Sequence, residues 1–388
     1  MTASDRMMPD SQFAMVGCGA RAVIGRHINE LNPGAAITHA VDPTEQGLRR
    51  ARDLFGDSVA TFASTEDLLA AAPPLAGAVV CTPDGTHAEV AGKLLRAGVP
   101  VYLEKPMAVT LAHADALLEA AAQSGTKLYV GHNMRHMAVV RMMKEIIDDG
   151  LIGAVKAVWC RHFVGHGGDY YFKDWHAERE QSGTLLLQKG AHDLDIIHYL
   201  AGASSELVQG LGALVVYGDV TDRRDNSGRI MPDWFSHDNW PPRAQTALNP
   251  VIDVEDISMV QMRLSNGVLA SYQQCHFTPD YWRNYTVIGD AGRLENFGDG
   301  EGGVVRVWNR RHDYAPEGDL EFPIVGDKGG HEDADLLTMA EFLRFLDGAD
   351  TVTSALAARD AVATAVTGAA SLRAGGGALL VPQAGGGA

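Results

Sequence analysis

The sequence contains few cysteines and no long apolar run, and each shortage excludes a class of protein. Its four cysteines lack paired spacing, so a disulfide-stabilised secreted domain is not indicated and a reducing cytoplasm is the expected location. No apolar run approaches the roughly 20 residues that cross a bilayer, so no membrane partner is expected. The first residues lack the basic and then apolar plan of a signal peptide.

Basic residues are also in the minority. The chain has 32 Lys and Arg against 49 Asp and Glu, which gives a formal net charge of −17. Binding to nucleic acid depends on basic side chains that neutralise phosphates, so this charge argues against a nucleic-acid partner. No internal repeat is found. The 388 residues, 46% of them hydrophobic, suffice for two domains that each have their own core.

A glycine-rich turn near the N-terminus predicts a dinucleotide site. The apolar run of residues 13–16 leads into Gly17-Cys18-Gly19-Ala20-Arg21-Ala22, and a helical pattern follows over residues 23–31. Two glycines permit a tight turn and a close approach of the backbone to a pyrophosphate, which then lies at the positive end of the helix. Ala22 stands where a third small residue is needed. On this motif alone, a glycine turn in another kind of α/β protein is the alternative.

The expected cofactor is NAD. The next strand pattern, residues 36–41, ends at Asp42, about 20 residues after the second glycine, where an acid can bind both ribose hydroxyls. The same carboxylate would repel the 2′-phosphate of NADP. NADP stays possible if Arg21 or Arg49 reaches that phosphate.

Strand and helix patterns alternate through the first 130 residues. Helical stretches such as residues 87–97 and 111–122 separate short strand patterns at residues 60–63, 77–81, 99–103 and 128–130. This alternation predicts a parallel, doubly wound sheet, whose ligands bind beyond the carboxyl ends of the strands. The segment from Cys81-Thr82-Pro83 to His87 and the tripeptide Glu104-Lys105-Pro106 both fall at such ends. We therefore expect them beside the cofactor.

In this order and spacing, the motifs resemble those of the Gfo/Idh/MocA oxidoreductase family, the relatives of glucose-fructose oxidoreductase and inositol dehydrogenase. The resemblance runs from Phe13 to about Leu380. It is most specific in the glycine turn, in Thr82-Pro83 with His87, in Glu104-Lys105-Pro106 and in residues 182–200. It implies that Lys105 lies between the nicotinamide and the substrate.

The family's second site is a pattern of Asp, three residues, His, two residues, Asp. His192 and Asp195 match the last two members, whereas Gln188 occupies the first. Oxidation of a secondary alcohol needs a base for the hydroxyl proton while the hydride leaves. The resemblance therefore makes His192 the expected base and Lys105 the group that orients the hydroxyl. A hydrogen-bonded structural histidine is the alternative for His192.

Three sets of site residues are expected from these motifs, from the stretch of residues 162–179, and from the residues after the strand pattern 128–130. Asn133 and Arg135 follow that strand pattern and are expected to line the cleft between the domains. The catalytic set is Lys105, Gln188, His192 and Asp195. The cofactor-binding set is Gly17, Gly19, Ala20, Arg21, Ala22, Asp42, Cys81, Thr82, Pro83, His87, Glu104, Lys105 and Asn133. The substrate-binding set is Lys105, Arg135, Tyr171, Trp175, Gln188, His192 and Asp195. No role is assigned to Lys189 or His331.

The second half predicts a domain of a different kind. Few helices separate its strand patterns, which lie at residues 155–160, 206–210, 213–217, 257–264, 268–275, 285–288 and 304–308. The predicted fold is α/β: a Rossmann domain (residues 11–136), then an α+β domain with a large open, mostly antiparallel sheet (137–380), and a flexible tail (381–388). Helical patterns at residues 333–346 and 355–373 close the second domain. In the family, one face of such a sheet carries the substrate pocket and the other often pairs subunits, which implies a homodimer or homotetramer.

Two irregular stretches are expected to shape the pocket. Residues 162–179 mix aromatic and hydrogen-bonding groups, as a carbohydrate site requires, and include Tyr171 and Trp175. Their His and Asp spacings match no familiar ligand pattern, so no metal is expected. Residues 218–249 predict a long loop, which is functional or disordered.

Together these features predict an NAD(P)-dependent dehydrogenase that acts on a secondary hydroxyl of a sugar, a cyclitol or a sugar derivative. One alternative is a glycoside-processing enzyme in which bound NAD oxidises the substrate transiently. A second alternative is a sensor of sugars or nucleotides without catalysis, which would not need both Lys105 and His192.

Overall fold

The structure is a computed structural model that describes residues 11–71, 75–326 and 332–385. The chain folds into two compact units. The first comprises Met1–His132 and Asp335–Arg359, and the second comprises Asn133–Ala334 and Asp360–Ala388. None of the described helices combines the length and the hydropathy that a membrane crossing requires.

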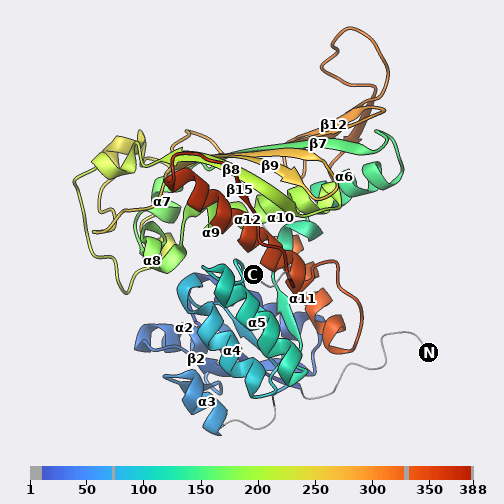
Figure 1. The fold of residues 1–388 in the computed structure, drawn as a ribbon. Helices are drawn as coiled ribbons and strands as arrows, with labels where there is room; N and C mark the ends of the chain where they lie inside the picture. The colour runs from blue at the N-terminus through green and yellow to red at the C-terminus, as the bar shows by residue number, and fades with distance from the viewer. Residues whose placement is uncertain (1–10, 72–74, 327–331, 386–388) are drawn as a thin grey trace. The chain divides into compact units, whose positions relative to one another are not determined.

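The first unit contains a six-stranded sheet of order β3-β2-β1-β4-β5-β6, of which β2 is labelled in Figure 1. All five pairings are parallel. The strands are β1 Ser11–Val16, β2 Ala35–Val41, β3 Ala60–Phe62, β4 Gly77–Val80, β5 Val101–Leu103 and β6 Leu128–Val130. The chain changes direction across the sheet between β1 and β4, which is where doubly wound sheets bind their ligands. The predicted Rossmann architecture is confirmed.

The connecting helices begin at local sequence signals. Thr44 and Thr110 accept hydrogen bonds from the backbone N–H groups of Gly47 and His113, and so cap α2 and α5. The helical pattern after the glycine turn is divided into a 3-10 helix, η2, and the short α1. The helices are η2 Ala20–Gly25, α1 Arg26–Leu31, α2 Glu45–Phe55, α3 Thr65–Ala71, α4 His87–Arg96 and α5 Leu111–Ser124.

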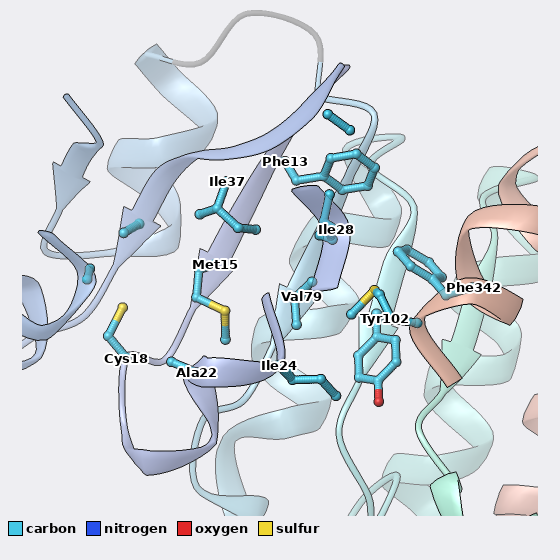
Figure 2. Close-up of a cluster of buried hydrophobic side chains, with 14 of the residues drawn as sticks. Phe13, Met15, Cys18, Ala22, Ile24, Ile28, Ile37, Val79, Tyr102 and Phe342 are labelled. Atoms are coloured by element: carbon cyan, nitrogen blue, oxygen red, sulfur yellow. The ribbon is translucent and has the colours of Figure 1, made fainter. Parts of the chain in front are cut away.

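The core of the first unit includes a helix from late in the chain. Phe342 of α11 (Glu332–Leu346) is buried and makes edge-on ring contacts with Phe13 and Tyr102 (Figure 2). Nearby, the Tyr129 hydroxyl donates to Glu341 at 2.7 Å. The domain boundaries expected from the sequence placed residues 335–359 in the second domain. They pack in the first because their apolar side chains complete its core.

The second unit contains a nine-stranded sheet of order β14-β13-β12-β11-β7-β10-β9-β8-β15. Among the strands that the structure describes in this sheet, only β7 and β10 pair in parallel, so the expected mostly antiparallel sheet is confirmed. Its strands are β7 Val155–Phe163, β8 Ser205–Ala213, β9 Ile257–Leu264, β10 Leu269–Cys275, β11 Trp282–Gly289, β12 Arg293–Phe297, β13 Val304–Trp308, β14 Leu320–Pro323 and β15 Leu379–Leu380. The pattern at residues 213–217 is not a strand, because β8 ends at Ala213 and a 3-10 helix follows at Tyr217–Asp219.

Helices cover one face of this sheet, which we call the inner face. The helix α10 packs on β7 and β10. A Cβ at Gly210 of β8 would lie 2.5 Å from the carbonyl oxygen of Gly368 in α12, so glycine permits that close approach. The helices are α6 Ala138–Asp148, α7 Gly167–Tyr171, α8 Arg179–Ser182, α9 Leu185–Gln188, α10 Gly190–Ala201 and α12 Ala355–Arg373, whose first turn falls in the first unit.

The C-terminal segment is partly anchored. The backbone N–H of Val381 donates to the Glu206 carbonyl, and Gln383 donates to the Ser205 carbonyl at 3.0 Å. Residues 381–385 were expected to be a flexible tail, but these bonds tie them to β8. Residues 386–388 lie outside the described part of the chain.

Candidate active site

The glycine turn follows directly after β1. Gly17 has φ = 87°, and a Cβ there would lie 2.7 Å from the Cys81 carbonyl and from the Thr82 nitrogen. Glycine is required because the ends of β1 and β4 approach each other at this point. At Gly19, no described atom lies within 4 Å of a Cβ position, which leaves open space before η2. This space fits the approach of a pyrophosphate to the turn.

Asp42 is held beside the turn by three donors. Its Oδ2 accepts a hydrogen bond from the Cys18 N–H at 2.9 Å, and its Oδ1 accepts from the N–H and the hydroxyl of Thr44 at 2.9 and 2.6 Å. A carboxylate has about four acceptor positions, so the protein fixes the orientation of Asp42 and leaves room for a ribose hydroxyl. Arg50, and not Arg49, reaches the same turn, because its Nε donates to the Cys18 carbonyl at 2.9 Å.

Arg21 and Glu104 bind each other. The Arg21 Nε donates to Glu104 at 2.6 Å, and its two terminal nitrogens donate to Asp335 at 2.5 and 2.7 Å. Burial opposes the charge of Arg21, but the two carboxylates outweigh it and hold its pKa well above the usual value. The sequence predicts that Arg21 and Glu104 contact the cofactor, and this stays a prediction. In the structure their charges tie the glycine turn to the loop before Lys105 and to the start of α11.

His87 joins the two other cofactor loops. Its ring nitrogens lie 2.8 Å from the Pro106 carbonyl oxygen and 2.9 Å from the Thr82 carbonyl oxygen. The segment after β4 is thereby fastened to the segment after β5 that contains Lys105. Burial raises the pKa of Cys81 well above the usual value, so its thiol stays neutral. The predicted loop residues are therefore brought together at one edge of the sheet.

The other predicted catalytic residues belong to the second unit. Gln188 ends α9, and His192 and Asp195 are buried in α10. Arg135, in a 3-10 helix that also contains Asn133, donates to both oxygens of Asp195 at 2.8 and 2.6 Å. The guanidinium of Arg135 also lies 4.8 Å from the centre of the Tyr199 ring. In the structure the charges of Asp195 and Arg135 pair with each other and hold α10. Their expected contacts with substrate stay a prediction.

Asp193 is a residue that sequence reasoning missed. Its fully buried carboxylate accepts hydrogen bonds from His162 at 2.9 Å, Tyr272 at 2.9 Å and Tyr285 at 2.5 Å. The Arg283 Nε lies 3.0 Å away. Burial alone would raise the pKa of Asp193, but Arg283 and His162 keep it below the usual range. The first turn of α10, next to His192, is thereby anchored to β7, β10 and β11.

Tyr171 and Trp175 lie in one series of aromatic contacts. The Trp175 ring stacks on His176 with centroids 3.7 Å apart, and His176 meets the edge of Tyr171 at 5.5 Å. Tyr171 then contacts His276 at 5.2 Å, just beyond the end of β10. The series leads from the half-buried Trp175, in the 3-10 helix Trp175–Ala177, to the inner face of the sheet.

The predicted long loop is ordered. Asp169 of α7 pairs with Lys173 at 2.9 Å and also accepts from the Asn239 amide at 2.7 Å. Trp234 donates to the Asp169 carbonyl, and Asn226 donates to the Lys173 carbonyl, each at 2.8 Å. These bonds fasten residues 218–249 to α7.

The described residues contain no group of three or more His, Cys, Asp or Glu side chains that could hold a metal ion. His331 lies outside the described ranges. Lys105 belongs to the first unit, and Gln188, His192 and Asp195 belong to the second.

Comparison with known proteins identifies the family. Residues 11–132 match the oxidoreductase family with an NAD-binding Rossmann fold, and residues 140–295 match the GFO/IDH/MocA C-terminal domain. The chain belongs to the Gfo/Idh/MocA oxidoreductase family. Its first unit is therefore an NAD-binding Rossmann fold, as the glycine turn and Asp42 indicated.

Individual relatives have named activities. The chain is 32% identical over 198 residues to inositol 2-dehydrogenase from Ralstonia nicotianae, covering 49% of this chain and 54% of that protein. It is 31% identical over 247 residues to 2,7-anhydro-N-acetylneuraminate hydratase from Mediterraneibacter gnavus, covering 59% and 62%. The matched regions thus span less than two thirds of these relatives.

Solved structures share the fold. The levoglucosan dehydrogenase complex with NADH and levoglucosan superposes with a TM-score of 0.78 at 16% identity, over 96% of this chain and 100% of that chain. GenD2 from gentamicin A biosynthesis, in complex with NAD, gives 0.75 at 18% identity, over 98% and 99%. At these identities the likeness shows the fold alone.

The position of Asp42 predicts cofactor preference. Asp42→Ala should weaken NAD binding by roughly 10- to 100-fold, because charge-assisted hydrogen bonds to the ribose are lost. NADP binding should change less, so the preference for NAD narrows. Titration of each cofactor by calorimetry measures both dissociation constants, and Asp53→Ala, which removes an exposed acid of α2, is the control. A wild type that binds NADP more tightly than NAD contradicts the assignment.

Buried histidines predict how stability depends on pH. Burial lowers the pKa of His162 to about 3 and that of His198 to about 4, against about 6.5 in an unfolded chain. Below pH 6.5 the unfolded chain therefore binds protons that the folded chain does not, so stability falls with pH until these groups titrate near pH 4 and 3. Between pH 6.5 and 4.5, each should reduce the free energy of unfolding by about 2–3 kcal/mol.

Urea unfolding at the two pH values measures this loss. His198→Gln keeps a hydrogen-bonding side chain but removes the titration, so its loss should be smaller than that of the wild type. An equal loss in both proteins would show that His198 is not held neutral.

Proposed function

We propose that the protein is an NAD-dependent dehydrogenase that oxidises a secondary hydroxyl of an uncharged polyol, such as a cyclitol or a sugar. The observation that carries this proposal is the position of Lys105 at the carboxyl end of β5. Glu104 ties its loop to the glycine turn through Arg21, and His87 ties it to the segment after β4. A lysine fixed at that edge of a Rossmann sheet is placed to act on a substrate beside the nicotinamide.

Different residues of the chain bind the cofactor and act on the substrate. The turn at Gly17 and Gly19 would hold the pyrophosphate, and Asp42 would hold the adenosine ribose. NAD bound there would supply the acceptor for the hydride. Lys105 donates a hydrogen bond to the reacting hydroxyl oxygen and stabilises its developing negative charge. His192 takes the hydroxyl proton.

Neighbouring residues hold the base in place. Asp193 and Asp195 anchor the two sides of α10 through Arg283 and Arg135, so His192 is carried on a rigid first turn. Gln188 lacks the charge of the family's aspartate and contributes hydrogen bonds to substrate hydroxyls instead. The names of relatives that act on inositol and levoglucosan support an uncharged polyol as substrate.

One relative favours a second candidate. A hydratase adds water, and such a reaction yields no net reduced cofactor. A chain of this family could therefore use bound NAD for transient oxidation of a glycoside. Net formation of NADH separates the two candidates.

The outer face of the second-unit sheet supports a proposed interface between copies. Trp159 of β7 is 50% exposed and Leu269 of β10 is 59% exposed, and Leu211 and Met259, which pair across β8 and β9, are also exposed. Polar side chains lie between them, since Gln273 is opposite Met259 and Arg263 is opposite Leu269. Several large apolar side chains left exposed on one face of a sheet favour an interaction surface. We propose that it pairs with a second copy of the chain, in a homodimer or homotetramer.

The function is tested by a spectrophotometric screen of sugars and cyclitols with NAD and NADP. With the best substrate, Lys105→Met and His192→Asn should each lower kcat by about 10²- to 10⁴-fold, because each removes a group that acts in the transition state. NAD binding should change little in either. Lys93→Met, which removes a lysine that pairs with Glu89 on α4, is the control. Near-normal turnover of the Lys105→Met protein would remove this lysine from the mechanism.

The interface is tested by sedimentation velocity. The wild type should sediment as a dimer or tetramer of the 41.5 kDa chain. Trp159→Glu should shift it toward monomer, because the substitution puts a charge into an apolar contact. Tyr314→Glu, an exposed aromatic in the loop between β13 and β14, should not. A monomeric wild type contradicts the interface.

A further inference from the structure

Two side chains on the inner face of the second-unit sheet carry polar atoms that have no hydrogen-bond partner among the described residues. They are the amide nitrogen of Gln274 in β10 and both ring nitrogens of His276, which follows β10. Both residues are at least 99% buried. The hydroxyl of the buried Ser258 in β9 also has no hydrogen-bond partner among the described residues. Buried polar groups in folded proteins are normally paired, so a cluster without partners requires an explanation.

The three positions lie close together on the sheet. Gln274 is directly opposite Ser258 in the pairing of β10 with β9, where side chains on one face are about 5 Å apart. His276 comes two residues after Gln274, and its ring lies 5.2 Å from that of Tyr171. The unpartnered atoms therefore form one polar strip, which we call the Gln274 strip.

The Gln274 strip reaches the start of α10. A Cβ at Gly190 would lie 3.5 Å from the side-chain amide oxygen of Gln274 and 2.9 Å from the Tyr272 ring. Gly190 stands between Gln188 and His192, two residues to which we assign parts in the reaction. The strip thus continues the proposed substrate site along the sheet.

The polar atoms of the strip itself carry no net charge. Of the cations near it, Arg283 is paired with Asp193 at 3.0 Å and with Asp299 at 3.6 Å, and the charge of Lys189 adds to burial in lowering the pKa of His276. Burial holds the pKa of His276 well below its usual value, so its ring is neutral and presents one donor and one acceptor. Neutral donors and acceptors in a buried setting suit hydroxyl groups, which both donate and accept.

We propose that Gln274 and His276, with Ser258 beside them, bind the hydroxyls of the polyol that lie away from its reacting carbon. The inference rests on the proposed function and deepens it, because it names residues that select among polyols. A substrate that lacks the matching hydroxyl leaves these buried groups unpaired and is rejected. Loss of such a hydrogen bond from a site built for it lowers kcat/KM by roughly 10²-fold or more.

The experiment compares the best polyol substrate with its analogues that each lack one hydroxyl. Gln274→Met and His276→Phe remove the polar atoms at similar volume, and Gln123→Met on the exposed face of α5 is the control. The wild type and the control should discriminate against at least one analogue by about 100-fold in kcat/KM. The variant that lacks the side chain contacting the missing hydroxyl should show a difference in kcat/KM of about threefold or less between the substrate and that analogue. The difference should appear mainly in KM, because the contact lies away from the reacting carbon.

Thermal unfolding of the variants is measured without substrate, because a purely structural role of these side chains would show as a lower unfolding temperature. Neither variant should unfold at a lower temperature than the wild type, because the nitrogens that are deleted have no partner among the described residues. The Tyr272 hydroxyl, 3.0 Å from the Gln274 amide oxygen, keeps its bond to Asp193 in the Gln274→Met protein. Unchanged discrimination in both variants would show that the strip binds buried water only, and this overturns the proposal. Unchanged discrimination with a lowered unfolding temperature would assign the strip to stability alone, with the same consequence.

The strip can be tested even if the proposed dehydrogenase function is wrong. If the wild type oxidises no polyol, the strip is tested by calorimetry with myo-inositol and levoglucosan in the presence of NAD. Weaker binding by the two variants then supports the strip without the dehydrogenase reaction. Equal binding, or none, by the wild type and the variants overturns it.

Discussion

The arrangement of the second unit depends on one buried carboxylate. Asp193 takes hydrogen bonds from His162, Tyr272 and Tyr285 and pairs with Arg283, and none of these groups is exposed by more than 1%. A charge without partners in that position would be strongly destabilising, and removal of one member of a buried ion pair costs about 3–5 kcal/mol. The helix α10 is therefore fixed to three strands at the turn that carries His192.

In the first unit, too, ion pairs fix the segments beside the proposed site. Arg21 bridges Glu104 and Asp335, and so fixes the glycine turn, the loop before Lys105 and the start of α11 relative to one another. His87 adds a neutral link between the loops after β4 and β5. In both units, residues placed next to the proposed chemistry are held by buried or partly buried ion pairs, which is how a site keeps its geometry without a bound substrate.

Local signals in the sequence were sufficient for much of this. The turn at Gly17 and Gly19 is predictable because its glycines belong to a short local motif. The one distant contact that requires glycine is the close approach of Gly17 to Cys81. The parallel, doubly wound sheet is predictable because strands and helices alternate along the chain. Lys105 and His192 could be proposed as site residues because their motifs are short and contiguous.

The remainder depends on contacts between distant parts of the chain. Asp335 lies 314 residues after Arg21, so no local pattern could show that the arginine is engaged with it. Asp193 looks like any acid in a helix until β7, β10 and β11 are paired in register. The same pairing reveals Gln274 opposite Ser258. Sequence patterns identify residue types and elements, whereas register decides which polar groups meet.

The most direct test of the account follows the transferred hydrogen. A polyol that the enzyme accepts is labelled with deuterium on the carbon bearing the reacting hydroxyl, and the cofactor and product are examined by NMR after one turnover. The account predicts that deuterium appears on the nicotinamide ring, in an amount equal to the oxidised product. Deuterium that returns to the product, with no net reduced cofactor, would contradict net dehydrogenation and favour transient oxidation.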